Sequence, residues 1–319
     1  MNHNNNCVAT IGFFDGVHRG HRFLIKHVMD EARKAGLRSV VVTFDRHPRQ
    51  VLQQEYQPEL LTTLADKVRL LQGTGIDHVE VLHFDETLAS LTAFDFMEQV
   101  LKEKLGAKKL VIGYDNRFGH NRTEGFDDYV RHGKSLGIEV IHNPAFLLNN
   151  VRVSSSVVRS FLKEGEARMA ALCLGRPHAI TGKVVGGHRE GRKMGFPTAN
   201  LDTSAYGLLI PKSGVYAVKA RIGNEGEWLP AMMNIGMRPT FNGNRLSLET
   251  NILDFKGDLY GNELHVQFID RVRDEHKFKN ADALTQQLLD DEELTRSLLA
   301  ATNKNTIPQD NQTSKQHEE

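Results

Sequence analysis

The sequence predicts an α/β protein with two domains: a parallel sheet with helices on both faces, followed by a small antiparallel β-barrel and a terminal helix. Its 319 residues are enough for two domains. The first half alternates β-branched runs with stretches of helical apolar spacing, which is typical of a parallel sheet covered by helices. Beyond residue 175 the helical spacing gives way to evenly spaced short strand patterns, which favour a barrel.

The first half predicts five strands and three helical stripes. Gly36, Gly75, Gly106 and Gly137 follow helical patterns, as expected of the left-handed residue that ends a helix. The predicted strands span residues 8–13, 39–44, 79–84, 109–114 and 138–142. The stripes are Phe23, Leu24, Val28, Ala32 and Ala35, then Leu64, Val68 and Leu71, then Phe94, Met97, Val100, Leu101 and Leu105.

The second half predicts two short helices within residues 153–174, broken at Gly165, then the barrel, then a last helix over residues 281–299. The residues after that helix are polar and predict a disordered tail. The predicted barrel strands span residues 179–185, 215–222, 228–235, 246–255 and 264–272. We therefore expect domains at residues 1–174 and 175–301, with the tail at 302–319.

Composition excludes several classes of protein. Lys plus Arg and Asp plus Glu each number 40, which argues against a polybasic protein that binds nucleic acid or a membrane surface. Cys7 and Cys173 form no CxxC motif, so neither a disulfide framework nor a structural zinc site is predicted. No apolar run reaches the ~18 residues of a membrane helix, and residues 1–10 lack the pattern of a signal peptide. We expect a cytoplasmic protein with no obligatory protein partner.

One motif follows the first predicted strand and enters the first helix: Gly12-Phe13-Phe14-Asp15-Gly16-Val17-His18-Arg19-Gly20-His21. Doubly wound folds bind their ligands there, outside the carboxyl ends of the strands. His18 and His21 share a helix face, and Gly20 between them leaves room for a ligand close to the backbone. A helix N-terminus suits phosphate, to which two imidazoles can donate hydrogen bonds. A surface histidine pair or a metal pair remains an alternative for HxxH alone, although a metal would need further ligands.

This string resembles the HxGH signature of the Rossmann-like nucleotidyltransferases. The residues of this motif resemble in particular those of the bacterial bifunctional riboflavin kinase/FMN adenylyltransferases, as do residues 43–48, 111–119 and 154–159. The resemblance implies that the first domain transfers AMP from ATP to FMN, releasing pyrophosphate and FAD, with His18 and His21 stabilising charge on the ATP phosphates. It implies that ATP and FMN are bound by Gly12, Phe13, Phe14, Asp15, Gly16, Gly20, His47, Pro48, Asp115, Arg117, Ser154, Ser155, Ser156 and Arg159.

Some of these residues have structural alternatives, and some neighbours depart from the family pattern. The serine run reads equally as the N-cap of a helix, and Asp115 with Arg117 as a loop ion pair. Arg46 stands where the family usually has Pro, and Asn116 where it usually has an aromatic residue. Ser156 replaces Thr and keeps the hydroxyl group.

A second motif lies at the start of the predicted barrel. Five glycines, at Gly182, Gly186, Gly187, Gly191 and Gly195, lead into Phe196-Pro197-Thr198-Ala199-Asn200. The glycines alone are also consistent with a pair of β-turns. In an extended segment Thr198 and Asn200 point the same way. They offer oxygen ligands that suit Mg²⁺ bound together with a nucleotide.

This second motif resembles the riboflavin kinase module of the same family, as do residues 174–177, 214–216, 234–241, 248–254, 260–261 and 273–278. The resemblance implies that ATP phosphorylates riboflavin, with Thr198 and Asn200 at Mg²⁺–ATP and Glu249 as the base. Alternation puts Glu249 and Asn251 on one strand face, and Asn251 stands where the family often has His. The implied ATP- and riboflavin-binding residues are Gly182, Lys183, Gly191, Lys193, Gly195, Phe196, Pro197, Thr198, Asn200 and Arg273.

The sequence therefore predicts a bifunctional enzyme that makes FMN and then FAD from riboflavin and two ATP. It predicts Mg²⁺ as cofactor, ATP as co-substrate, no tightly bound prosthetic group, and only small molecules as partners. A kinase with a drifted adenylyltransferase half is one alternative, which only Asn116 supports. A flavin-binding regulator without turnover is another, and the presence of His18, His21, Thr198 and Glu249 disfavours it.

Overall fold

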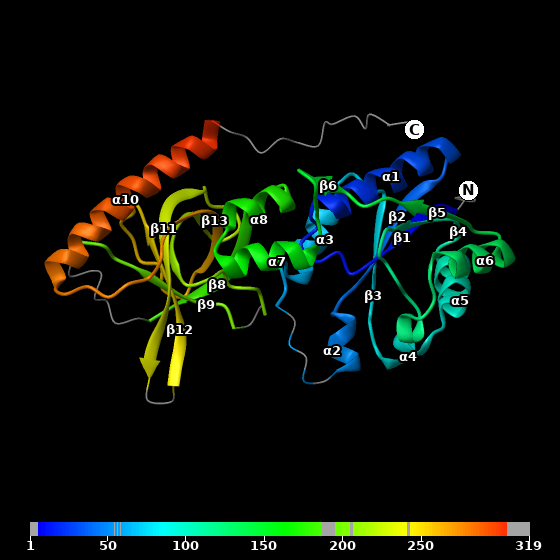
Figure 1. Ribbon diagram of the computed structural model, residues 1–319, viewed down its shortest axis with the longest axis horizontal. Coiled ribbons are helices and arrows are strands. Elements are labelled where there is room, and N and C mark those ends of the chain that lie inside the picture. The colour runs from blue at the N-terminus through cyan, green and yellow to red at the C-terminus, as the bar shows by residue number, and fades with distance from the viewer. Residues whose placement is uncertain are drawn as a thin grey trace. The chain divides into compact units, whose positions relative to one another are not determined.

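The computed structural model describes residues 6–53, 55, 57, 59–186, 195–204, 207–240 and 243–304. The chain divides into two compact units, Met1–Ser155 and Ser156–Glu319. Each unit has its own sheet and its own hydrophobic core (Figure 1). The α/β class and the order of the two architectures are as the sequence predicts.

A five-stranded parallel sheet forms the centre of the first unit, in the order β3-β2-β1-β4-β5. All five predicted strands are confirmed. The chain order reverses at β1, which has β2 on one side and β4 on the other. The carboxyl ends of these strands therefore flank the crevice where such sheets bind ligands. The strands are β1 (Cys7–Ile11), β2 (Arg38–Phe44), β3 (His78–Leu82), β4 (Ala107–Gly113) and β5 (Glu139–Asn143).

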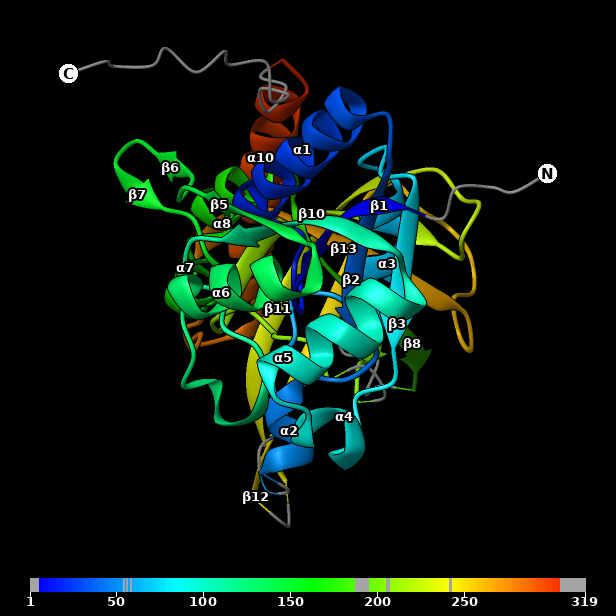
Figure 2. The same ribbon diagram turned by 90° about the vertical axis from the view of Figure 1, so that its right-hand side faces the viewer.

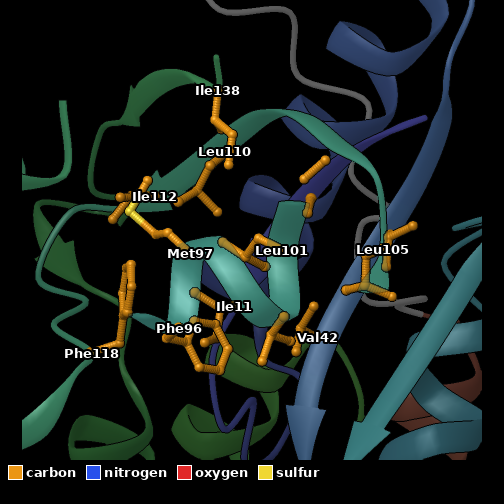
Figure 3. Close-up of a cluster of buried hydrophobic side chains, with 14 of the residues drawn as sticks. Ile11, Val42, Phe96, Met97, Leu101, Leu105, Leu110, Ile112, Phe118 and Ile138 are labelled. Carbon is orange, nitrogen blue, oxygen red and sulfur yellow. The ribbon is translucent and has the colours of Figure 1, made fainter. Parts of the chain in front are cut away.

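Helices cover both faces of this sheet, because alternate strand residues are apolar on both sides. α1 (Arg19–Ala35) and α3 (Leu64–Gln72) pack on the face that carries Val8 and Val41. The opposite face packs against a helix that begins as α5 (Ala93–Asp95) and continues as the π-helix η1 (Phe96–Lys104), and against α6 (Phe126–Leu136). Figure 2 shows α5 and α6 in front of the strands, and Figure 3 shows Phe96, Met97 and Leu101 of η1 against the sheet residues.

Three of the four glycines predicted to end helices do so: Gly36 and Gly137 cap α1 and α6, and Gly106 follows the cap of η1, all with positive φ. The fourth prediction is wrong, because α3 is capped by Gly73, and Gly75 lies two residues further on. Several small elements escape the sequence analysis because they are too short to show a period. These are α2 (Pro48–Leu52), α4 (Glu86–Ser90), η2 (His120–Arg122), β6 (Leu147–Leu148) and β7 (Val151–Arg152).

The second unit is a closed antiparallel barrel, in the order β10-β11-β12-β9-β8-β13. The five predicted strands are confirmed, and β9, which is four residues long, is an addition. The barrel interior is filled by side chains such as Val218, Met233 and Phe268. The strands are β8 (His178–Val185), β9 (Ala199–Asp202), β10 (Gly214–Ile222), β11 (Leu229–Thr240), β12 (Gly243–Ile252) and β13 (Glu263–Arg273).

Three helices accompany the barrel. α7 (Ser155–Glu164) and α8 (Ala167–Leu174) are separated at Gly165, as predicted, where φ is 88°. α8 packs on β8 and β13, and Ala167 joins the barrel core. The last helix, α10 (Ala281–Lys304), lies against β10, β11 and β13 on the outside of the barrel (Figure 1).

The domain boundary at residue 175 stays a prediction. The second compact unit begins at Ser156 and contains α8. α10 extends to Lys304, into the segment predicted as a disordered tail. The rest of that segment lies outside the described residues. Among the helices that the structure describes, none combines the length and the hydropathy needed to cross a bilayer.

We expect a fragment of residues 156–304 to be more stable than one of residues 175–304, because the shorter fragment lacks the apolar cover that α8 gives β8 and β13. Its thermal midpoint should be at least ~4 °C lower, which corresponds to about 1 kcal/mol for a domain of this size. Differential scanning calorimetry measures the difference. Equal midpoints would contradict the assignment of α8 to the barrel core.

Candidate active sites

The loop between β1 and α1, Gly12–His18, is the strained centre of the first unit. Phe14 and Val17 have φ angles of 56° and 39°, in the left-handed region, and Gly16 lies there too, at 80°. A β-branched residue such as Val17 is a genuine outlier in that region. Strain of this kind costs about 1–3 kcal/mol per residue and persists only where the surroundings enforce it.

Asp15 provides that enforcement. Its carboxylate is 4% exposed and accepts hydrogen bonds from the backbone N–H of Leu61, at 3.0 Å, and of Thr62, at 3.2 Å. The Thr62 hydroxyl oxygen accepts from the Gly16 N–H at 3.1 Å. Ser155, the first residue of α7, donates its hydroxyl to the Asp15 carbonyl at 2.9 Å. Asp15 therefore anchors the β1–α1 loop to the segment before α3.

His18 and His21 come together at the start of α1. His18 caps the helix, because its Nδ1 accepts from the His21 N–H at 3.2 Å. The two rings stack with their centres 3.5 Å apart and their planes 18° apart. A Cβ at Gly20 would lie 3.0 Å from the Val153 carbonyl oxygen and 3.1 Å from His18 Nδ1. Close packing within the protein therefore favours a glycine at this position, whether or not a ligand is bound.

The other predicted binding residues of the first unit surround the carboxyl ends of β1, β2 and β4. Phe13 meets His47 edge to face, with ring centres 4.8 Å apart. His47 caps α2 by accepting from the Arg49 N–H at 3.1 Å, and Pro48 is the first residue of that helix. Asp115 and Arg117 are exposed and line a cavity of about 340 Å³ after β4.

One departure from the family pattern, Asn116, has a structural explanation here. The Asn116 side-chain amide donates to the Ile11 carbonyl and so ties the loop after β4 to the end of β1. Arg46 is half exposed, with its Nε 3.8 Å from the Asp45 carboxylate. Ser156 is exposed, and Ser154 and Arg159 are partly buried.

The second site lies on the outer face of the barrel. In the strand register Glu249 of β12 is opposite Asn200 of β9 on one side and Asn234 of β11 on the other. Directly paired residues of antiparallel strands project to the same face. The three side chains therefore form one polar row, and the Thr198 hydroxyl donates to Glu249 Oε2 at 3.2 Å.

Two cavities adjoin Thr198, next to this row. A cleft of about 690 Å³ is lined by Thr198, Ala199 and residues 255–260. A smaller pocket of about 260 Å³ is mainly apolar, with Phe196, Met232 and Leu288 in its wall, and it also contains Glu249 and Asn234. Thr198 lines both cavities. A group bound in the cleft and a group bound in the pocket would therefore approach each other at Thr198 and Glu249.

Neighbouring side chains hold this arrangement in place. The Asn251 amide, another departure from the family pattern, donates to the Pro197 carbonyl at 2.7 Å. Arg273 donates to the Asp291 carboxylate of α10 from Nη2 at 2.7 Å and from Nε at 2.9 Å. Asp291 is 1% exposed, so this buried pair anchors α10 to the end of β13. Arg273 thus serves a structural purpose at the edge of the pocket.

The remaining predicted residues of the second unit are only partly described. A Cβ at Gly182 would lie 2.9 Å from the Asp202 carbonyl oxygen, so this glycine permits the close approach of β8 and β9. Lys183 is exposed, and Gly195 has a φ of 82°. Gly191 and Lys193 lie outside the described residues.

The sequence analysis missed Asn234, Asp291 and Lys67. Asn234 lies in a segment that matches the family, but only the strand register shows that it adjoins Glu249. Asp291 and Lys67 look like ordinary surface charges within helical patterns, and only their partners in distant segments show that they are buried.

The donor set beside Glu249 fits a magnesium ion bound mainly by a nucleotide. A hydroxyl, an amide oxygen and one carboxylate are hard oxygen ligands, which Mg²⁺ prefers. Within the described residues no three His, Cys, Asp or Glu side chains gather as a protein metal cage would require. Phosphate oxygens would therefore have to complete the coordination.

Comparison with known proteins gives a match in each half of the chain. The family model for FAD synthetase matches residues 1–157, and the model for riboflavin kinase matches residues 174–299. The bifunctional riboflavin kinase/FMN adenylyltransferase of Escherichia coli (strain K12) is 38% identical over 296 residues, which cover 93% of this chain and 94% of that protein. The protein of the same name from Bacillus subtilis (strain 168) is 34% identical over 293 residues, 90% of each chain.

A solved structure shares the fold. A crystal structure described as a macrolide-efflux protein from Streptococcus pneumoniae has a TM-score of 0.82 and 34% identity, and the match covers 91% of this chain and 94% of that one. The efflux activity in that description belongs to that protein alone. The chain is a member of the family of bifunctional riboflavin kinase/FMN adenylyltransferases, with its FAD synthetase module in the first half and its riboflavin kinase module in the second.

Proposed function

We propose that adenylyl transfer to FMN takes place at the carboxyl ends of β1, β2 and β4, beside the stacked pair of His18 and His21. The observation that carries this proposal is that both imidazoles lie at the N-terminus of α1, where backbone N–H groups favour phosphate. An oxygen of the FMN phosphate attacks the α-phosphorus of ATP, the bond to the β-phosphate breaks, and pyrophosphate leaves. The two histidines stabilise the negative charge that develops on the phosphates.

We assign ligand binding at this site to residues from three regions of the first unit. The first region comprises the β1–α1 loop and the start of α2, which bring together the rings of Phe13 and His47. Asp115 and Arg117 line the cavity after β4, where a nucleotide or flavin phosphate can bind. Ser154 and Ser155 adjoin the loop through the Ser155–Asp15 bond. Ser156 and Arg159, which belong to the second compact unit, stay predictions.

For riboflavin phosphorylation we assign ATP to the larger cleft of the barrel and the flavin ring to the smaller apolar pocket. The shared position of Thr198 supports this assignment, since both substrates must meet beside Glu249. The ribityl hydroxyl oxygen attacks the γ-phosphorus and ADP leaves. Glu249 accepts the hydroxyl proton, and Asn234 lies next to it to orient the ribityl chain.

Thr198 and Asn200 would hold Mg²⁺ together with the ATP phosphates, which leaves the Glu249 carboxylate to accept the proton. When bound there, the ion would offset negative charge on the transferring phosphoryl group. The cytoplasmic location and the lack of nucleic-acid, membrane and obligatory protein partners stay predictions.

His21→Ala should lower the turnover of FMN to FAD by about 10²–10³, the usual effect of removing one donor that stabilises transition-state charge. Riboflavin phosphorylation by the same chain should stay within about twofold of wild type, since a single charge-stabilising donor acts only at its own site. Chromatography of the flavin products measures both steps.

His27→Ala is the matched control. His27 lies on the same helix, but its ring contacts Asn143 at 2.9 Å and lies away from the histidine pair. Equal loss of both activities in His21→Ala, or equal losses in the two variants, would contradict the proposed role.

Glu249→Gln should lower riboflavin phosphorylation by about 10²–10⁴, because the amide keeps the shape of the side chain but cannot accept the proton. Because the transition state of phosphoryl transfer is loose, we expect the loss of riboflavin phosphorylation to lie toward the lower end of that range. Riboflavin binding, followed by flavin fluorescence, and adenylylation of supplied FMN should change little.

Glu292→Gln, on α10, is a control in which the carboxylate only pairs with Arg296. If Glu249→Gln phosphorylates riboflavin within about threefold of wild type, Glu249 orients the substrate and another group takes the proton.

A further inference from the structure

Lys67 is a buried cation beside the FAD synthetase site. It lies on α3, a helix with the charged neighbours Asp66 and Arg69, yet it is only 2% exposed. Asp15 is another charged residue in the described part of the first unit that is less than one-tenth exposed. It anchors the β1–α1 loop. An ammonium group is expensive to bury without a compensating role.

The ammonium group of Lys67 makes two contacts at the carboxyl ends of β1 and β2. It donates to the Phe44 carbonyl, at the last residue of β2, at 2.7 Å. It also lies 3.9 Å from the centre of the Phe13 ring, a close cation–π contact. The same ring meets His47 on its edge. Lys67 thus connects the β1–α1 loop, the end of β2 and the cap of α2.

The charges around Lys67 come from several elements. Asp15 follows β1 and Asp45 follows β2, and both carboxylates favour the ammonium form, although neither is its hydrogen-bond acceptor at Nζ. Asp45 is itself paired with His83 at 2.6 Å and adjoins Arg46, and Asp66 of α3 pairs with Arg69. Burial outweighs the two carboxylates and lowers the pKa of Lys67 to about 8.

We propose that Lys67 is a positioning residue for adenylyl transfer, whose ammonium group holds the Phe13 ring and the end of β2 in the geometry that the β1–α1 loop requires. It acts through Phe13 and His47 and does not itself reach the substrates. Loss of its charge removes the attraction for the ring face and leaves the Phe44 carbonyl with a weaker partner. This inference rests on the location that we propose for adenylyl transfer.

The charge state of Lys67 gives the direction in which FMN adenylylation should change with pH. Below about pH 8 Lys67 carries its charge, and as the pH rises through that value the charge is lost in the folded protein. The kcat/KM for FMN adenylylation should therefore fall above about pH 8, since this quantity reports the pKa values of the free enzyme. Phosphate groups such as that of FMN have their second pKa near 6, so their titration does not produce a fall in that range.

The test measures FMN adenylylation by the full-length chain between pH 7 and 9.5 in wild type, Lys67→Met and Lys67→Arg. Lys67→Met keeps the stem but no charge. It should lower kcat at pH 7 about tenfold to a hundredfold, as small misplacements of reacting groups do, and its profile should be flat. Lys67→Arg keeps a charge that does not titrate in this range. It should restore most of the activity and abolish the fall at high pH.

The thermal midpoint of the first unit, measured by scanning calorimetry of each full-length variant, reports whether that unit is folded. Arg69→Met is the matched control: it removes a cation from the same helix, but Arg69 is exposed and pairs only with Asp66. The proposal is overturned if Lys67→Met adenylylates FMN within about threefold of wild type. It is also overturned if the kcat/KM of all three proteins falls in the same way above about pH 8. A flat wild-type profile also overturns it, and that measurement needs no variant. A failure of His21→Ala to affect FAD formation would instead overturn the location of the site.

Discussion

The FAD synthetase site depends on one constraint: a loop with Phe14, Gly16 and Val17 in left-handed backbone has to be held in place. Hydrogen bonds from the backbone of Leu61 and Thr62 to the buried Asp15 carboxylate meet that requirement. The bent loop then delivers His18 to the start of α1, where its ring caps the helix and stacks on His21. The helix cap, the histidine pair and the proposed phosphate-binding position thus depend on one buried carboxylate.

In the riboflavin kinase module the corresponding constraint is strand register. Glu249 lies between Asn200 and Asn234 because β12 pairs with β9 and β11 at that point, and a shift by one residue would turn Glu249 into the barrel core. Barrel closure removes the freedom to slip, and the Asn251–Pro197 bond fixes the segment that carries Thr198. Strand register therefore sets the position of Glu249 in the proposed phosphoryl-transfer site, and the segments at Thr198 and at residues 255–260 complete it.

Most of the fold was predictable, because β-branched runs and helix-ending glycines are local signals, and Gly36 and Gly137 have the backbone that their positions require. The strand β9 was missed because four residues show no period. Asn116 and Asn251 were identified only as departures from the family pattern, and the structure shows that both donate to backbone carbonyls. Lys67 could not be found from the sequence, since its burial depends on Phe13 and Phe44, which come from other elements.

The most direct test of this account is the kcat of FMN adenylylation in Asp15→Ala, with riboflavin phosphorylation in the same chain as the reference. Alanine removes the carboxylate that accepts the backbone N–H groups of Leu61 and Thr62, so the loop loses its anchor. The account predicts a fall in kcat of about a hundredfold, with the KM values for ATP and FMN nearly unchanged, because the reacting groups are misplaced. An unchanged kcat, or a change in KM alone, would contradict the account and make Asp15 a ligand contact.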